Sequence, residues 1–138
     1  MRDHSKLKAY QLADSLVLRV YSATRLLPQE ERSGLASQMR RAAISVVSNL
    51  VEGSARISEL DYIRFVEMAF GSSRELQYQI GLAARLGYLE SDALEPAATQ
   101  VAKTLGALLK ALRNRRSDSP HLVVRPPQPT AHNPQPTE

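Results

Sequence analysis

At 138 residues, 43% of them hydrophobic, the chain is long enough for one domain with one core. It contains no cysteine, which excludes disulfides, thiolate nucleophiles and the usual structural zinc sites. Its net charge of +4 permits nucleic-acid binding, but many proteins that bind no nucleic acid share such an excess.

Four helical segments are predicted, and they lie near residues 6–27, 31–53, 58–86 and 91–115. In the first, Leu12, Leu16 and Val20 belong to an apolar stripe with helical spacing, and Pro28 ends the helix. Aromatic residues make up only 5% of the chain, so the core must consist of aliphatic residues, which suits helix packing. Because the connections are short, successive helices should be antiparallel neighbours. The predicted fold is all-α, an up-down antiparallel four-helix bundle over residues 1–116.

The second predicted helix has a wide apolar arc. Apolar residues cover about half of its circumference, and they are Leu35, Met39, Ala42, Ala43, Val46, Val47, Leu50 and Val51. So wide an arc exceeds what one bundle core requires. We therefore expect the excess to meet another subunit in a homo-oligomer. The alternative is that this helix is simply central in its own bundle.

A narrow polar ribbon lies opposite this arc and carries Arg41 and Glu52. Both side chains are expected to be partly buried, and an unpaired buried charge is very costly. They are about 16 Å apart along the helix axis, so each needs a partner elsewhere: Glu75 for Arg41, and Arg56 or Arg74 for Glu52. The predicted structural network consists of Arg41, Asn49, Glu52, Arg56, Arg74 and Glu75. A ligand or nucleic-acid site on the ribbon is the alternative.

The third predicted helix has signals at both ends and an anomaly in its middle. Ser58 and Asp61 have the spacing of an acidic capping box, and Gly87 is a plausible C-terminal cap. Gly71 lies in the interior, where glycine costs about 1 kcal/mol relative to alanine. We interpret Gly71 as a site of close helix packing, with a kink as the rival explanation.

The fourth predicted helix has Ser91 or Asp92 as its N-cap, and Pro96 lies within its first turn or just beyond it. Six of the eight prolines then lie between Pro120 and Pro136. Residues 117–138 are therefore expected to be a proline-rich disordered tail. Whether this tail docks a partner or is an inert extension stays open, the second being favoured.

The sequence offers little for catalysis. The three histidines, at positions 4, 121 and 132, lie in the predicted terminal extensions, and no Glu-x-x-His pair or P-loop is present. We expect no enzyme activity, no cofactor and no metal. No secretory signal is visible, and no apolar run is long enough to cross a bilayer. The default expectation is a cytoplasmic protein that has no membrane partner.

The basic residues of the second, third and fourth predicted helices are candidates for contacts with phosphate groups. They are Arg40, Arg64, Lys103, Lys110, Arg113, Arg115 and Arg116. Recognition would be of phosphate and shape, because aromatic residues for base stacking are scarce. The cluster at residues 113–116 also has a structural explanation, since basic residues at a helix C-terminus complement the helix dipole.

The second and third predicted helices also contain an ordered series of motifs. The first is Leu27-Pro28-x-x-Glu31-x-x-Gly34-Leu35-x-x-Gln38-x-Arg40-Arg41-Ala42-Ala43-x-Ser45. The others are Asn49-x-x-Glu52-Gly53-x-x-Arg56 and Phe65-x-x-x-Ala69-x-Gly71-Ser72-x-x-Glu75-Leu76. From about Lys6 to Arg113 the chain resembles the four-helix-bundle family that is also called the large-subunit rRNA intervening-sequence protein family.

This resemblance implies properties that the residue patterns alone do not. Members of the family are bundles that assemble into rings, typically homopentamers. Some are encoded within intervening sequences of large-subunit rRNA genes, and others look like the accessory protein of diversity-generating retroelements, which binds a reverse transcriptase and nucleic acid. The motif positions expected to define the fold are Arg41, Asn49, Glu52, Gly53, Gly71 and Glu75. Val51 departs from the usual alanine, and the tail lies outside the family pattern.

The leading functional prediction is a non-enzymatic oligomeric adaptor that binds nucleic acid or a nucleoprotein partner, such as a reverse transcriptase. Ring symmetry would repeat a weak basic patch and raise avidity. The alternative is a purely protein-binding scaffold with no role in nucleic-acid binding. An enzyme that acts on a small molecule is the third hypothesis. The choice between RNA and DNA stays open.

Overall fold

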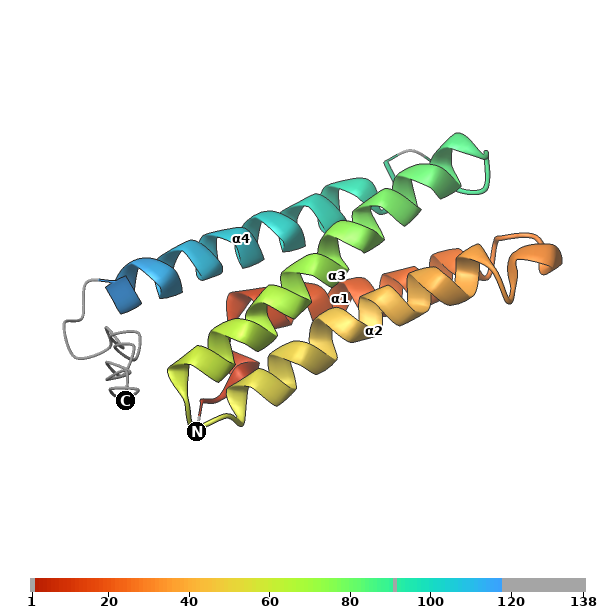
Figure 1. The fold of residues 1–138 in the computed structure, drawn as a ribbon. Coiled ribbons are helices and arrows are strands. Elements are labelled where there is room, and N and C mark those ends of the chain that lie inside the picture. Colours follow the sequence, from red (N-terminus) through yellow and green to blue (C-terminus); the bar gives the residue numbers. More distant parts are fainter. Residues whose placement is uncertain (1, 91, 118–138) are drawn as a thin grey trace, which may run out of the picture.

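The structure is a computed structural model that describes residues 2–90 and 92–117 (Figure 1). Within these ranges every regular element is helical. The elements in chain order are the 3₁₀ turn η1 (His4–Lys6), α1 (Lys8–Thr24), the 3₁₀ turn η2 (Gln29–Glu31), α2 (Leu35–Ser54), α3 (Glu59–Arg85) and α4 (Glu95–Ser117). The predicted tail lies outside the described residues from position 118 onward.

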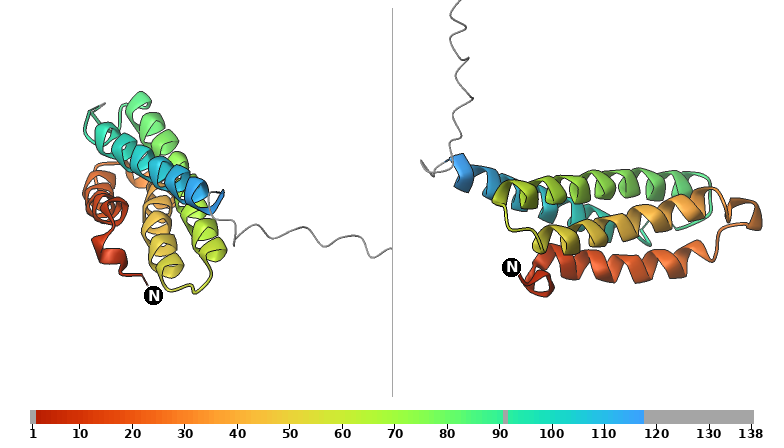
Figure 2. Two further views of the ribbon diagram at one scale, coloured as in Figure 1. Left: turned by 90° about the vertical axis from the view of Figure 1, so that its left-hand side faces the viewer. Right: turned by 60° about the horizontal axis from the view of Figure 1, so that its bottom comes forward.

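The four helices pack in chain order and close into a bundle. α1 contacts α2, α2 contacts α3, α3 contacts α4, and α4 returns to α1. Figure 2 shows that each helix runs opposite to the one before it. The core is aliphatic as predicted, and its largest fully buried side chains include Met39, Leu50, Leu76, Ile80 and Leu105. None of the described helices is long and apolar enough to cross a membrane.

The connection between α1 and α2 is longer than predicted. α1 ends at Thr24, and Pro28 has an extended backbone that leads into the 3₁₀ turn η2. Gly34 precedes α2, which begins at Leu35, four residues later than expected. Glu31, where the second helix was predicted to begin, lies instead in the separate 3₁₀ turn η2.

The ends of α3 confirm the predicted caps. The Ser58 hydroxyl oxygen accepts a hydrogen bond from the backbone N–H of Asp61 at 3.2 Å. At the other end Gly87 has a φ of +79°. The N–H of Tyr88 donates to the carbonyl of Ala83 at 2.9 Å, and the N–H of Gly87 donates to Ala84 at 3.0 Å. These two bonds form a Schellman motif.

The start of α4 differs from its prediction. The helix begins at Glu95, and Pro96 occupies its first turn, where a missing N–H costs no helical hydrogen bond. Asp92 lies three residues before this start, and Ser91 lies outside the described residues. The predicted N-cap at Asp92 is therefore wrong.

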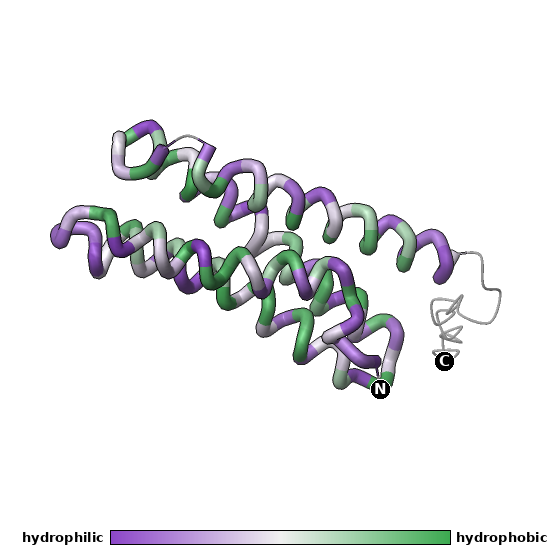
Figure 3. Tube along the Cα trace, turned by 180° about the vertical axis from the view of Figure 1, so that it is seen from behind, coloured by the Kyte–Doolittle hydropathy of each residue, from purple (hydrophilic) through white to green (hydrophobic). Residues whose placement is uncertain are grey.

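The wide apolar arc of α2 is largely used inside the bundle. Of its eight residues, Met39, Ala42, Ala43, Val46 and Leu50 are buried, and Leu35 and Val47 pack against the core. The Val51 residue is exposed, at 37%. Figure 3 shows hydrophobic and hydrophilic residues alternating along the helices, as expected for amphipathic elements. The arc therefore supports the alternative that α2 buries this surface in its own bundle.

The glycine that permits close helix packing within this chain is Gly53, and the prediction for Gly71 is wrong. A Cβ placed on Gly71 would meet no heavy atom within 4 Å, and the residue is exposed. A Cβ on Gly53 would lie 2.7 Å from the Cβ of Phe65 and 3.4 Å from Cδ1 of Tyr62. The close contact between α2 and α3 thus occurs near the connection between them.

Candidate functional site

Two of the predicted phosphate contacts pair with glutamates of α3. Arg115 forms an ion pair with Glu59, and Nη2 of Arg113 lies 3.3 Å from Oε1 of Glu67. Both arginine side chains remain more than half exposed, at 64% and 58%. These pairs connect the end of α4 to the first half of α3 and give Arg113 and Arg115 a structural role as ion-pair partners, which differs from the predicted interaction with the helix dipole. Arg116 is half-buried.

The sequence did not reveal the part that Arg2 plays at this end of the bundle. Arg2 Nη2 lies 2.9 Å from Glu59 Oε2, and its guanidinium lies 4.0 Å from the centroid of the Tyr62 ring. The hydrogen bond from Arg115, together with the positive charges of Arg115 and Arg2, holds the pKa of Glu59 below its ordinary value. No local pattern could have identified this cluster, because it joins the N-terminus to α3 and α4.

The clearest basic surface runs along α3 and α4. Lys103 and Lys110 are exposed, and their spacing of seven residues places them on one side of α4. They take part in none of the ion pairs formed among residues 2–90 and 92–117. A groove of about 270 Å³ between the two helices is lined by Phe70, Arg74, Gln77, Thr99, Ala102, Lys103 and Gly106. We name this groove the α3–α4 groove. Its wall contains two cations, Arg74 and Lys103, and Lys110 lies outside the groove, on the same side of α4 as Lys103.

The other two predicted phosphate contacts lie elsewhere. Arg64 is exposed on α3. Arg40 lies near the connection between α1 and α2, where its Nε donates to Thr24 Oγ1 at 2.8 Å and its guanidinium lies 4.8 Å from the Tyr21 ring centroid. The seven predicted contacts therefore do not form one continuous site.

The predicted polar network does not form within the described chain. Arg41 and Glu52 are both exposed, because their ribbon faces outward, and neither takes part in an ion pair within the described ranges. Glu75 instead accepts a hydrogen bond from Gln79 at 3.2 Å. The other predicted members also have different contacts: Asn49 donates to the Ser45 carbonyl, Arg56 lies over the Phe65 ring, and Arg74 donates to Gln77.

Three residues of that network, Arg41, Glu52 and Glu75, instead contribute to an exposed surface of α2 and α3, here named the hairpin surface. It consists of Arg41, Ile44, Val51 and Glu52 on α2, and Met68, Gly71 and Glu75 on α3. The hydroxyl groups of Ser45 and Ser72 hydrogen-bond at 2.8 Å and link the two helices. Ile44, Val51 and Met68 are 42%, 37% and 43% exposed. The hairpin surface therefore combines apolar side chains with charges of both signs.

No metal site is evident in the described part of the chain. Residues 2–90 and 92–117 contain no group of three or more histidine, aspartate or glutamate side chains that could hold a metal ion. Of the three histidines, His4 lies in η1, whereas His121 and His132 lie outside the described residues.

Comparison with known proteins supports the fold and the family. A crystal structure of a protein of unknown function from the S23 ribosomal protein family, from Bacteroides thetaiotaomicron VPI-5482, is similar with a TM-score of 0.67. The identity is 20%, and the match covers 74% of this chain and 95% of the other. No curated protein matches the chain. The family model described as 23S rRNA-intervening sequence protein matches residues 5–110. Because this match covers most of the chain, the protein belongs to the 23S rRNA-intervening sequence protein family.

Proposed function

We propose that the protein is a cytoplasmic, non-enzymatic oligomeric adaptor that assembles through the hairpin surface and binds nucleic acid along the α3–α4 groove. The observation that carries the proposal concerns the family motif. Of its positions, Gly53 is explained by close packing inside the bundle, whereas Arg41, Glu52, Gly71 and Glu75 are exposed. Residues that characterise the family but contribute little to the core suggest a contact outside the single chain.

The chemistry of the hairpin surface suits a contact with a second copy of the chain. Its three exposed apolar side chains are accompanied by one arginine and two glutamates. Such a surface can bury apolar area at the centre of an interface while opposite charges pair between subunits. A ring of five copies, which the family resemblance implies, would repeat the α3–α4 groove around the assembly and raise its avidity for a long polyanion.

Assembly is tested by light scattering on the full chain with two matched substitutions. Met68→Asp places a charge on the hairpin surface, and Leu18→Asp places the same charge on α1, where the leucine is 68% exposed. Both side chains already face solvent, so neither substitution should unfold the bundle. We expect Met68→Asp to give monomers and Leu18→Asp to keep the oligomer. A monomeric unsubstituted protein, or dissociation by Leu18→Asp alone, would contradict the proposal.

Nucleic-acid binding is tested by fluorescence anisotropy with structured RNA and duplex DNA at about 50 and 200 mM salt. The double substitution Lys103→Gln with Lys110→Gln removes two charges from the α3–α4 side. Lys6→Gln with Lys8→Gln removes the same charge from the N-terminal region. We expect the first pair to reduce the slope of log K against log salt by about 2, because each phosphate contact contributes about 0.9, and the second pair to leave it unchanged. Equal effects of the two pairs would show that only net charge matters.

A protein-binding scaffold is the second candidate function, and a hollow beside α1 favours it. Leu18 and Leu26 are 68% and 75% exposed. They border a hollow of about 400 Å³ that also includes Arg19, Ser22, Ala23, Ala93 and Leu94. Exposed leucines around a mostly apolar hollow are typical of a protein-binding surface. Assembly without any nucleic-acid binding at the lower salt concentration would favour this function, and a nucleoprotein or reverse-transcriptase-like partner could use both surfaces.

A further inference from the structure

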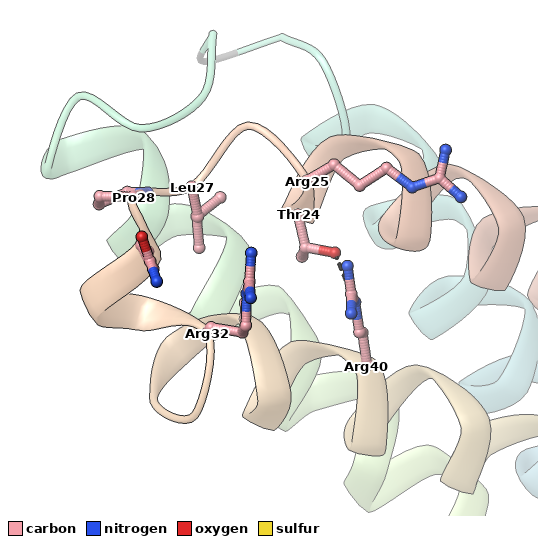
Figure 4. Close-up of a pocket in the computed structure, with 8 residues that line it drawn as sticks. Thr24, Arg25, Leu27, Pro28, Arg32 and Arg40 are labelled. Atoms are coloured by element: carbon pink, nitrogen blue, oxygen red, sulfur yellow. Dashed lines mark hydrogen bonds between the residues drawn. The ribbon is translucent and has the colours of Figure 1, made fainter.

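A cavity at the α1–α2 connection has a different character from the surfaces above. Its volume is about 340 Å³, and it is lined by Thr24, Arg25, Leu27, Pro28, Gln29, Arg32, Ala36 and Arg40 (Figure 4). Three of these eight residues are arginines, and none is an aspartate or a glutamate. The three arginines take part in none of the ion pairs formed within the described ranges. The cavity is therefore a concentration of positive charge without a carboxylate in its wall.

The arginines are held in different ways. In Figure 4 the side chain of Arg40 points to Thr24, that of Arg32 points toward Leu27, and that of Arg25 extends away from both. Arg40 is fixed by its hydrogen bond to Thr24, whose hydroxyl in turn donates to the Val20 carbonyl at 2.7 Å. Thr24 is only 3% exposed. This arrangement occupies Nε of Arg40, and its two terminal nitrogens stay available to a ligand.

Glu30 and Glu31 are neighbours of cavity residues in the sequence, but neither of them lines the cavity. Glu31, adjacent to Arg32, interacts with Tyr88 of the α3–α4 connection, and burial together with the charge of Glu31 and a hydrogen bond to it raises the pKa of Tyr88. Glu31 therefore contacts Tyr88 and does not line the cavity, and its Oε1 lies 2.9 Å from the position that a Cβ on Gly34 would take.

The start of α2 also borders the cavity. Gly34 precedes this helix and has no side chain that could cap the first backbone N–H groups. Ala36, in the first turn, lines the cavity. The N-terminal end of a helix carries unsatisfied N–H groups and a partial positive charge, both of which favour an anion.

We propose that this cavity binds a phosphate group, with Arg32 and Arg40 as its main ligands. A phosphate monoester carries close to two negative charges at neutral pH and presents three acceptor oxygens, which suits two guanidinium groups better than a singly charged carboxylate does. The volume lies at the lower end of the range for small-molecule sites, about 300–1,000 Å³. It leaves room for part of the molecule that carries the phosphate, either a small phosphate ester or a nucleic-acid terminus. The proposal does not depend on the function proposed above.

The test is calorimetric titration of the full-length protein with inorganic phosphate at constant ionic strength. Arg32→Gln replaces an exposed side chain that forms no hydrogen bond within the described ranges, and it keeps the backbone bond from Arg32 N–H to Gln29, so the fold should be unaffected. Arg40→Gln removes the second ligand but also the bond to Thr24. Lys8→Gln, at the start of α1, removes the same charge at an exposed position outside the cavity. We expect Arg32→Gln and Arg40→Gln to raise the Kd for phosphate by about tenfold or more, as expected for loss of a charge-assisted hydrogen bond, and Lys8→Gln to leave it unchanged.

Two further probes distinguish the source of the phosphate. Glycerol phosphate represents a small ester, and a short oligonucleotide with a 5′-phosphate is compared with the same oligonucleotide ending in a 5′-hydroxyl. An effect of Arg32→Gln on the first probe alone assigns the cavity to small phosphate esters, and an effect only on the 5′-phosphorylated oligonucleotide assigns it to nucleic-acid ends. Two results would overturn the proposal: no saturable binding of any phosphate probe at concentrations up to about 10 mM, ten times a Kd of about 1 mM, or equal weakening by Lys8→Gln.

Discussion

Substituting alanine at two glycines tests the close contact between α2 and α3. Gly53 and Gly71 both lie within helices, so helix propensity alone predicts that alanine stabilises each of them, by up to about 1 kcal/mol. The structure predicts opposite signs. A Cβ on Gly53 would lie 2.7 Å from the Cβ of Phe65, whereas a Cβ on Gly71 would meet nothing within 4 Å.

The expected magnitude follows from what can move. The Phe65 Cβ is attached directly to the backbone of α3, so a rotamer change of the ring cannot relieve the contact, and the two helices must separate. Overpacking of this kind costs about 1–3 kcal/mol. The gain in propensity at Gly53 is small because the residue lies in the last turn of α2. We therefore expect Gly53→Ala to destabilise the protein by about 1–2 kcal/mol and Gly71→Ala to stabilise it by about 0.5–1 kcal/mol.

The assay is urea unfolding followed by circular dichroism at two or more protein concentrations. Concentration matters because Gly71 belongs to the hairpin surface, where a loss of stability caused by weaker self-association would grow as the protein becomes more concentrated. Unchanged or increased stability of Gly53→Ala would refute the reasoning about the α2–α3 contact. If Gly71→Ala lowers the stability by an amount that does not depend on protein concentration, the conclusion that a Cβ fits at position 71 without a clash is refuted.

The remaining predictions concern the ends of the helices. The pKa of Glu59 is lowered in the folded protein, so its pairing with Arg115 and Arg2 stabilises the fold above the ordinary glutamate pKa of about 4.3 and is lost as the pH falls through the lower, folded-state value. Glu59→Gln should thus lower the unfolding free energy at pH 7 by no more than about 1 kcal/mol, and the difference from the unsubstituted protein should disappear in acid; a difference that persists there would contradict the assignment. Gly87→Ala should destabilise the protein by about 1–2 kcal/mol, because Gly87 has a φ of +79° that residues with a Cβ adopt only at a cost, and thermal unfolding of the two proteins measures this.

Local signals in the sequence predicted the fold because each depends on residues close together in the chain. The apolar stripe of α1, the cap at Ser58 and the left-handed Gly87 all follow from the periodicity or the backbone preference of a few neighbouring residues. The boundaries were less accurate where two such signals compete. Pro28 and the acids after it could begin a helix or form a separate turn, and the structure has a 3₁₀ turn.

Contacts between helices could not be predicted in the same way. Arg41 and Glu52 were expected to need partners because their helix is so apolar, yet the apolar arc packs inward and leaves the ribbon in solvent. The identity of the close-packed glycine depends on the register of α2 against α3, which places Gly53 opposite Phe65. The periodicity of one helix contains no information about its register against the next.

Pairing between charged side chains also depends on contacts between helices, so the sequence alone does not show which cations remain available to bind an anion. The sequence drew attention to residues 113–116, where basic residues are closest together, but Arg113 and Arg115 pair with glutamates of α3. Arg25, Arg32 and Arg40 are spread over sixteen positions and attract no attention in the sequence, yet the turn after Pro28 brings them to one cavity with no carboxylate in its wall. A cluster of basic residues in the sequence can therefore consist largely of cations that form ion pairs in the folded protein. A binding site for phosphate depends instead on cations that folding brings together without their counter-ions, and in this protein these lie at the α1–α2 connection and along the α3–α4 groove.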